Sequence, residues 1–297
     1  MSSYLVYTDS GADLPQEIYA RYDIRIVPMD YLLNGESITF DTKAPDHNEH
    51  CDALYAAQKN NADVHTSQIT PYRYIDTWTP ELQKGYDILY ISFSSGMSAT
   101  YQNALNAADQ LKDDFPDRTI ECVDSLAATG GQGVITYCAA MNQANGMSLE
   151  ENAARLREKI PYMCHRFTVG DLGYLHKGGR VSAAVALIGG VLDIKPLLII
   201  DDEGKLEMVG KARGRNAALK GLLKDYVAEM GVEGVPKVVF ITHTSLYKEA
   251  DHLADMLRQV AEPGTEVYTI CETPIIGVHT GPDFFSICGW GKRRKRK

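Results

Sequence analysis

Short apolar runs alternate with segments of helical periodicity along the first half of the chain. Three of these runs, Tyr4–Thr8, Ile88–Phe93 and Thr119–Val123, have the length of β-strands, and a segment typical of a helix follows each of them. This alternation predicts an α/β fold, a mainly parallel sheet with helices on both faces. Small polar residues follow each run, and ligands of such sheets lie beyond the carboxyl ends of the strands.

The pattern changes near Pro161. Two apolar runs, Leu197–Ile200 and Lys205–Val209, flank the turn Asp201–Gly204 and predict a β-hairpin, while Ser182–Val191 is typical of an apolar helix. We therefore expect a second, α+β domain with a mixed sheet. The expected organisation is an α/β domain over residues 1–160, an α+β domain over residues 161–291 and a disordered basic tail over residues 292–297.

Composition narrows the classes of function. The net charge is −9 although Lys292–Lys297 are all basic, and so acidic a body argues against a nucleic-acid-binding protein. The basic tail could touch anionic lipid, but a solvated chain end is the simpler interpretation. Six widely spaced cysteines without a CxxC pair, and the lack of HExxH, indicate reduced thiols and no metal site. Without a signal-peptide pattern or an apolar run of spanning length, we expect a cytoplasmic protein.

The turn Ser94-Ser95-Gly96 stands between an apolar strand and a predicted helix. Backbone N–H groups at a helix start favour an anion because they are unpaired and the helix dipole lies behind them. The turn is no P-loop, since Met97–Thr100 supplies no lysine, and a GxSxG motif is also missing. From this stretch alone, a helix cap and a ligand site remain equally open. A transferase that handles phosphate or a nucleotide here, together with Arg180 or Arg213, is the alternative function.

Each of the other polar groups has a plain alternative. The loop Thr66–Gln68 offers hydroxyl groups, but ordinary turn chemistry explains it more simply. His279 lies beside a turn, where a lone histidine is more often packed or solvated than a ligand contact. Arg180 and Arg213 could hold a phosphate or carboxylate, or could form surface ion pairs with the acidic body. The stretch Val181–Leu192 could line an apolar pocket, but plain core is the commoner outcome.

Eight motifs follow one another along nearly the whole chain. They are Thr8-Asp9-Ser10, Thr66-Ser67-Gln68, Ser94–Gln102, Asp124-Ser125, Lys177–Val181, Lys195-Pro196, Ala212-Arg213-Gly214 and His279–Pro282. In kind and in order, these motifs resemble those of the DegV family, bacterial fatty-acid-binding proteins of which some serve as the binding subunit of fatty acid kinase.

The resemblance implies a carrier and not an enzyme. One long-chain fatty acid would be buried between two domains, with its carboxylate held by Thr66 and by Ser95 in the Ser94-Ser95 turn and approached by His279. No cofactor is implied besides this ligand. A separate ATP-dependent kinase subunit would convert the presented carboxylate into an acyl phosphate for phospholipid synthesis. Arg180 and Arg213 would contact this partner, and a transient contact with a membrane surface is also expected.

Two positions depart from the family pattern. Ile69 follows Thr-Ser-Gln where the family usually has proline, and Asp283 follows Gly-Pro where the family tends to have glycine. Asp283 adds a negative charge near His279, where it could hold the imidazolium or repel a carboxylate. Either departure could alter the choice of ligand without changing the fold.

Overall fold

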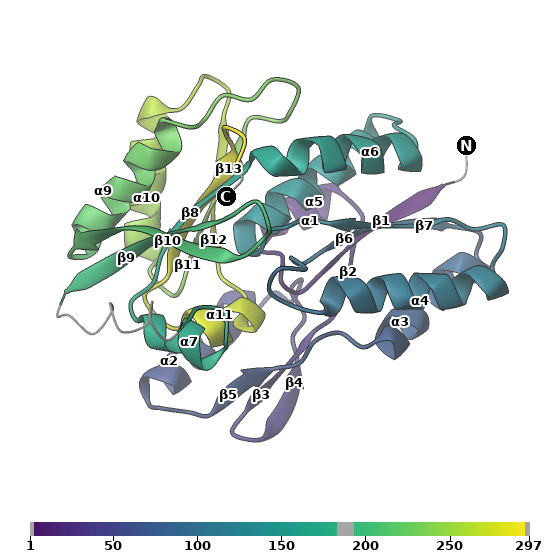
Figure 1. The fold of residues 1–297 in the computed structure, drawn as a ribbon, viewed down its shortest axis with the longest axis horizontal. Coiled ribbons are helices and arrows are strands. Elements are labelled where there is room, and N and C mark those ends of the chain that lie inside the picture. The colour runs from purple at the N-terminus through teal and green to yellow at the C-terminus, as the bar shows by residue number, and fades with distance from the viewer. Residues whose placement is uncertain (1–2, 183–192, 295–297) are drawn as a thin grey trace.

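The computed structural model describes residues 3–182 and 193–294. A four-stranded parallel sheet forms its first layer, with strand order β2-β1-β6-β7 (Figure 1). Its strands are β1 (Tyr4–Asp9), β2 (Ile24–Val27), β6 (Asp87–Ser92) and β7 (Ile120–Asp124). The predicted parallel sheet is confirmed, and the strands at its centre are buried on both faces, as their continuous apolar runs require.

A six-stranded mixed sheet forms the second layer, as expected for the second half. Its strand order is β10-β9-β8-β13-β11-β12, and only β11 and β12 pair in parallel. The predicted hairpin is present as β9 and β10, which are longer than predicted. The strands are β8 (Met163–Thr168), β9 (Ile194–Ile200), β10 (Leu206–Arg213), β11 (Val238–His243), β12 (Glu266–Cys271) and β13 (Phe285–Trp290).

A third, three-stranded sheet was predicted only in part. The turn signal Asn34-Gly35 predicts a hairpin between the apolar segment Ile24–Leu33 and a returning strand Ser37–Phe40, and this hairpin is present. The apolar segment from Ile24 to Leu33 looks like one strand in the sequence, but it divides at Pro28. Proline has no N–H to donate to a ladder, so β2 ends at Val27 and the chain leaves the parallel sheet. The sheet has the antiparallel order β4-β3-β5 and consists of β3 (Asp30–Leu33), β4 (Glu36–Thr39) and β5 (Val64–Thr66).

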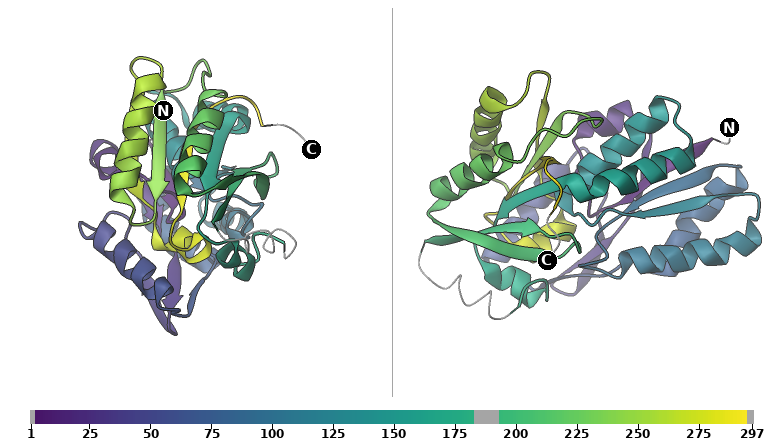
Figure 2. Two further views of the ribbon diagram at one scale, coloured as in Figure 1. Left: turned by 90° about the vertical axis from the view of Figure 1, so that its left-hand side faces the viewer. Right: turned by 45° about the horizontal axis from the view of Figure 1, so that its top comes forward.

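Helices cover the sheets and connect their strands (Figure 2). The sequence Thr70-Pro71 predicts a helix start, and α3 begins there, because the Thr70 hydroxyl accepts the N–H of Arg73 and Pro71 occupies the first helical position. The helices are α1 (Gln16–Arg21), α2 (His47–Lys59), α3 (Pro71–Gln83), α4 (Thr100–Asp114), α5 (Thr129–Ala144), α6 (Leu149–Lys159), α7 (Leu172–Lys177), α9 (Arg215–Val227), α10 (Tyr247–Val260) and α11 (Pro274–Thr280), with the 3-10 turn η1 (Ile160–Tyr162).

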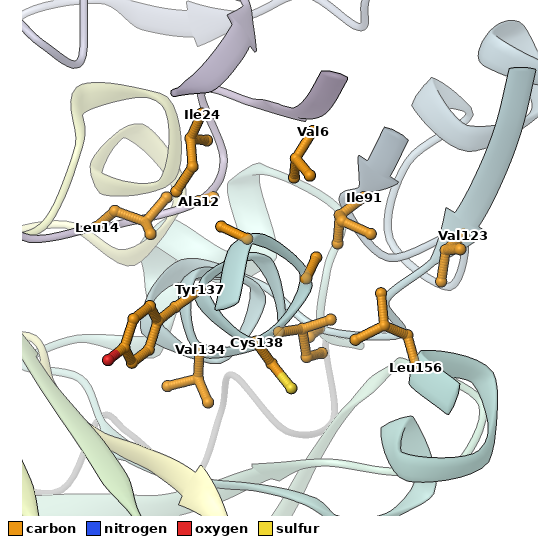
Figure 3. Packing of buried hydrophobic residues seen from close by; sticks show 14 of the residues in the cluster. Val6, Ala12, Leu14, Ile24, Ile91, Val123, Val134, Tyr137, Cys138 and Leu156 are labelled. Atoms are coloured by element: carbon orange, nitrogen blue, oxygen red, sulfur yellow. The ribbon is translucent and has the colours of Figure 1, made fainter. Parts of the chain in front are cut away.

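Helix α5 lies between the parallel sheet and the mixed sheet, and one apolar cluster surrounds it (Figure 3). Val6 and Ile91 of the parallel sheet and Phe240 of the mixed sheet belong to this same cluster. The helix has almost no exposed face, which explains its alanine- and glycine-rich sequence. The division at residues 160 and 161 stays a prediction, but the two halves share this core.

The C-terminal end is more ordered than expected at Arg294. This side chain, inside the segment predicted to be a solvated tail, donates to the carbonyl groups of Leu126, Met163 and Asp201 at 2.7, 2.7 and 3.0 Å. Residues 295–297 lie outside the described chain, as does nearly all of the predicted helix Ser182–Val191. Among the described helices, none combines the length and the apolar character needed to cross a membrane.

Candidate functional site

A cavity of about 470 Å³ lies where the three sheets and helices α5, α7 and α11 meet. Its wall is mostly apolar, and its volume is typical of sites for small organic ligands. The large apolar side chains of this wall include Phe93, Met97, Phe167, Ile200, Leu206 and Phe284. Most of them belong to the apolar cluster between β9, β10 and α7, so the same packing that stabilises the fold shapes the cavity.

Thr66 and His279 form a polar pair on the cavity wall. Thr66 ends β5, His279 lies in the last turn of α11, and their Oγ1 and Nε2 atoms are 2.7 Å apart. Burial away from water lowers the pKa of His279 to about 4, and the positive charge of Arg180 acts in the same direction. The imidazole is therefore neutral near pH 7 and can serve as one hydrogen-bond donor without a permanent charge.

Two glycines allow α7 and α11 to approach each other beside this pair (Figure 1). A Cβ on Gly178 would lie 2.4 Å from Nδ1 of His279, and a Cβ on Gly281 would lie 2.4 Å from Cδ2 of Tyr174. Gly281 also has φ of +68°, which strains any other residue. The glycines of the Lys177–Arg180 and His279–Pro282 motifs thus allow the close packing of α7 and α11 that surrounds the His279 ring.

Arg180 lies at the outer side of the polar pair. It lines the main cavity and also a neighbouring cavity of about 230 Å³, which contains Thr66, His279, His65 and Lys177. Burial lowers the pKa of the Arg180 guanidinium from its ordinary value, which still leaves it charged at neutral pH. The mouth beyond Thr66 and His279 therefore contains three basic side chains, of which Lys177 and His65 pair with the carboxylate of Asp63 at 3.3 and 2.9 Å.

Ser94 and Ser95 are not brought to this cavity. The Ser94 hydroxyl is buried and donates to the carbonyl of Gly204 at 2.7 Å, under the tip of the β9–β10 hairpin. Ser95 is exposed, and its N–H donates to Oδ1 of Asp124 at 3.2 Å. Neither residue is among those that line the cavity in the described chain. The turn instead fastens the hairpin to the parallel sheet, which the sequence could not show because the hairpin lies far along the chain.

Ser98, which belongs to the same Ser94–Gln102 motif, does line the cavity. It precedes α4, and its hydroxyl accepts the N–H of Thr100 at 3.2 Å and lies 2.9 Å from the Thr100 hydroxyl. The start of α4 therefore faces the cavity through Met97, Ser98 and Ala99. A helix start thus borders the cavity, three residues after Ser95. Ala99 is the N-cap of α4 and forms no side-chain cap hydrogen bond, so the contact between Ser98 and Thr100 is a local turn and not a helix cap.

Three further residues singled out in the sequence, Arg213, Asp283 and Ile69, are not among the residues that line the cavity in the described chain. Arg213 ends β10, is exposed and does not line the cavity. The carboxylate of Asp283 accepts from Arg215 at 2.7 Å, so its charge is paired with a cation on α9 rather than with His279. Ile69 is buried in an apolar cluster, and its carbonyl accepts from Asn103 at 2.8 Å. This departure from the family pattern is thus accommodated by packing.

Buried carboxyl groups that the sequence did not single out hold α11 in place. Glu272 accepts from the Thr280 hydroxyl at 2.5 Å, and Asp13 accepts the N–H of Thr273 at 2.9 Å. Burial raises the pKa of Asp13 to about 7 and that of Glu272 well above its ordinary value, and the charge of Asp13 raises the pKa of Glu272 further. His279 is therefore positioned from the far end of its helix as well. No group of metal-binding side chains occurs among residues 3–182 and 193–294.

Comparisons with known proteins agree with this architecture. A family model described as "Uncharacterised protein, DegV family" matches residues 3–290. A DegV domain-containing protein of Clostridium perfringens (strain 13 / Type A) is 33% identical over 281 residues, which cover 95% of each chain. A DegV domain-containing protein of Streptococcus pyogenes serotype M3 is 34% identical over 285 residues, 96% of this chain and 97% of that protein.

Solved structures of DegV proteins have the same fold. A DegV family protein from Thermus thermophilus, described by its fatty-acid binding, has a TM-score of 0.83 at 27% identity and covers 97% of this chain and 99% of its own. A DegV lipid-binding protein from Thermotoga maritima also has a TM-score of 0.83, at 25% identity over 99% of this chain and all of its own. By its full-length family match and its relatives of more than 30% identity, the chain belongs to the DegV family.

Proposed function

We propose that this protein binds a long-chain fatty acid in the cavity, with the carboxylate at Thr66 and His279 and the acyl chain along the apolar wall. The observation that supports this most is the hydrogen-bonded polar pair in a cavity whose wall is mostly apolar. Membership of a family with fatty-acid-binding members points the same way. In this role the protein is a carrier whose ligand is the fatty acid, and we propose no cofactor.

The chemistry of the wall suits such a ligand. Each buried CH₂ group contributes about 0.8 kcal/mol, so a long acyl chain supplies most of the affinity. The carboxylate must recover the hydrogen bonds that it loses with water. The Ser98 hydroxyl is a suitable donor, and so is the Thr66 hydroxyl when the neutral imidazole of His279 donates its Nε2–H to it, with the start of α4 behind them. We assign Ser98 to this cradle in place of Ser95, the residue that the family resemblance implied.

The proposal extends to a partner. A carboxylate at Thr66 and His279 would border the basic mouth formed by His65, Lys177 and Arg180, where a separate ATP-dependent fatty acid kinase could reach it to form an acyl phosphate for lipid synthesis. Arg180 and the exposed Arg213 are the proposed contacts of that kinase, with a transient membrane contact during transfer. The six buried, free cysteines favour a cytoplasmic location.

The alternative, a phosphate- or nucleotide-handling transferase at Ser94-Ser95-Gly96, has less support. The N–H of Ser95 donates to the carboxylate of Asp124, and the N–H of Gly96 donates to the Ser94 hydroxyl. Groups that would bind a phosphate are thus already paired, one of them with an anion. A Cβ on Gly96 would lie 2.4 Å from the carbonyl oxygen of Glu203, so the hairpin also covers the turn.

Organic extraction of the purified protein followed by mass spectrometry tests the proposed function. We expect a long-chain fatty acid at close to one molecule per chain, or its uptake when stearic acid is offered to delipidated protein. The absence of both a bound fatty acid and uptake would overturn the proposal. Saturable ATP binding or ATP turnover by the protein alone would favour the transferase.

The substitution Thr66→Val should weaken stearate binding by roughly tenfold to a hundredfold, because it removes a hydrogen bond to a charged group at almost constant volume. Ser98→Ala should also weaken binding, whereas Ser95→Ala should change it by no more than about twofold, as is usual for exposed sites without special contacts. Isothermal titration of the three variants measures these effects. A strong loss in Ser95→Ala with none in Ser98→Ala would return the carboxylate to the Ser95 position.

A further inference from the structure

A second polar group lies on the cavity wall, apart from Thr66 and His279. It consists of Thr129 at the start of α5, His165 on β8, and Ser286 and Cys288 on β13. All four residues are buried, with exposed fractions of 6, 4, 1 and 0%. We call them the inner polar group. A fatty acid with a plain hydrocarbon chain offers these side chains nothing to bind.

The strand register places His165 and Cys288 one step along the strands from Phe167, a residue of the apolar wall, and Ser286 beside Phe167. His165 lies opposite Cys288, and Phe167 lies opposite Ser286, in the antiparallel pair of β8 and β13. Successive residues on one face of a strand are about 7 Å apart, so His165 lies that distance further along β8 than Phe167. The inner polar group therefore faces the part of the cavity next to α5, where the chain of a bound fatty acid would run.

His165 is the member of the group that lacks partners. Cys288 donates to Ser286 at 3.5 Å, and the Ser286 and Thr242 hydroxyls bond to each other. Neither ring nitrogen of His165 has a hydrogen-bond partner within the described chain, although the side chain is almost fully buried. A buried polar group without a partner is costly, and such a group on a cavity wall indicates a ligand or water that satisfies it.

The ring of His165 is also fixed in place. A Cβ on Gly131 would lie 1.8 Å from its Nε2 atom, so the backbone of α5 packs directly against the imidazole. Burial lowers the pKa of His165 well below its ordinary value, and the charge of Arg294 acts in the same direction. The backbone carbonyls of Met163 and Ala128 raise the pKa, but neither forms a hydrogen bond of normal geometry with the imidazole ring. A neutral imidazole has one donor and one acceptor nitrogen, and a hydroxyl group can pair with either one of them, as acceptor or as donor.

We propose that the cavity is built for a fatty acid that carries a hydroxyl group on its chain, and that His165 recognises this hydroxyl. The inference rests on the proposed function, because it assigns the chain of the same ligand. A second carboxylate fits less well. Arg294, the cation with the largest effect on the pKa of His165, does not line the cavity, and its Nε and Nη1 atoms donate to three backbone carbonyls.

Competition binding with stearic acid and a series of monohydroxystearic acids, which differ only in hydroxyl position, tests the inference on delipidated full-length protein. At least one positional isomer should bind about tenfold more tightly than stearate. His165→Leu should abolish this preference, and His165→Gln, which keeps a donor and an acceptor, should retain part of it. Phe167→Leu, a neighbouring change in the same wall, should weaken both acids and leave their ratio unchanged.

The possible outcomes separate the two proposals. Stearate binding without a preference for any isomer would overturn this inference and leave the proposed function standing, and so would a structure with only a water molecule at His165. A preference that persists in His165→Leu would also overturn it, as would tighter binding of the dicarboxylic acid of the same length. Binding of neither stearate nor any isomer would overturn both proposals.

Discussion

The substitution Ala128→Phe is expected to lower the affinity for stearate by at least about a hundredfold, since exclusion of only four CH₂ groups would cost about 3 kcal/mol. Ala128 directly precedes α5, is 6% exposed and lines the cavity among the residues of its apolar wall. A phenyl ring there can occupy the space of the acyl chain rather than displace packed atoms. The protein should therefore remain folded, which circular dichroism and thermal unfolding can establish alongside titration with stearate.

Val209→Phe is the matched control for this prediction. Val209 lies on β10, is 48% exposed and is absent from the cavity wall, so the same bulky ring is added to the outside of the protein. Stearate affinity in this variant should stay within about twofold of the parent, as for most exposed substitutions. Normal binding by a well-folded Ala128→Phe variant would show that the acyl chain does not occupy this cavity.

The substitution Gly133→Val is expected to reduce the free energy of unfolding by at least about 3 kcal/mol, at the upper end for overpacked cores. A Cβ on Gly133 in α5 would lie 2.0 Å from the backbone carbonyl oxygen of Asp13. That oxygen cannot move cheaply, because the Asp13 carboxylate also holds the N–H of Thr273 at the base of α11. The substitution thus strains both the packing of α5 and the support of His279. Urea denaturation measures the effect.

Gly221→Ala provides the comparison for a glycine that is not required. Gly221 lies inside α9, and a Cβ there would lie 3.4 Å from Cδ1 of Leu197, which is an ordinary contact. Because alanine favours a helix over glycine, this variant should gain roughly 0.5–1 kcal/mol of stability. A change of less than about 1 kcal/mol in Gly133→Val would contradict the tight packing of α5.

The features that local sequence patterns govern were predictable. Alternating apolar runs and helical segments predicted the parallel sheet, the turn Asp201–Gly204 predicted the β9–β10 hairpin, and Thr70-Pro71 predicted the start of α3. Each of these depends on neighbours within a few residues, where backbone sterics and capping act directly. The motif order also led to Thr66 and His279, which the fold brings into contact.

The features that long-range packing decides were not predictable. Nothing near Ser94 indicates that a hairpin tip far along the chain will cover it, and this contact is what removes the Ser94-Ser95 turn from the cavity. The buried setting of His165 likewise depends on the glycine of another element, since Gly131 leaves room for the ring. Pro28 is the exception, because the missing N–H that ends β2 could have been recognised in the sequence.

The close approach of α7 and α11 has a consequence for how this protein can evolve. Gly178 makes room for the His279 ring, and Gly281 makes room for the Tyr174 ring, so each segment supplies the space that the other needs. Neither segment can change freely, because a bulkier residue at Gly178 requires a smaller one at position 279, and the positive φ of Gly281 disfavours any side chain there as well. A chimera that exchanges one of the two motifs between diverged relatives should therefore lose the alignment of His279 unless its counterpart is exchanged as well.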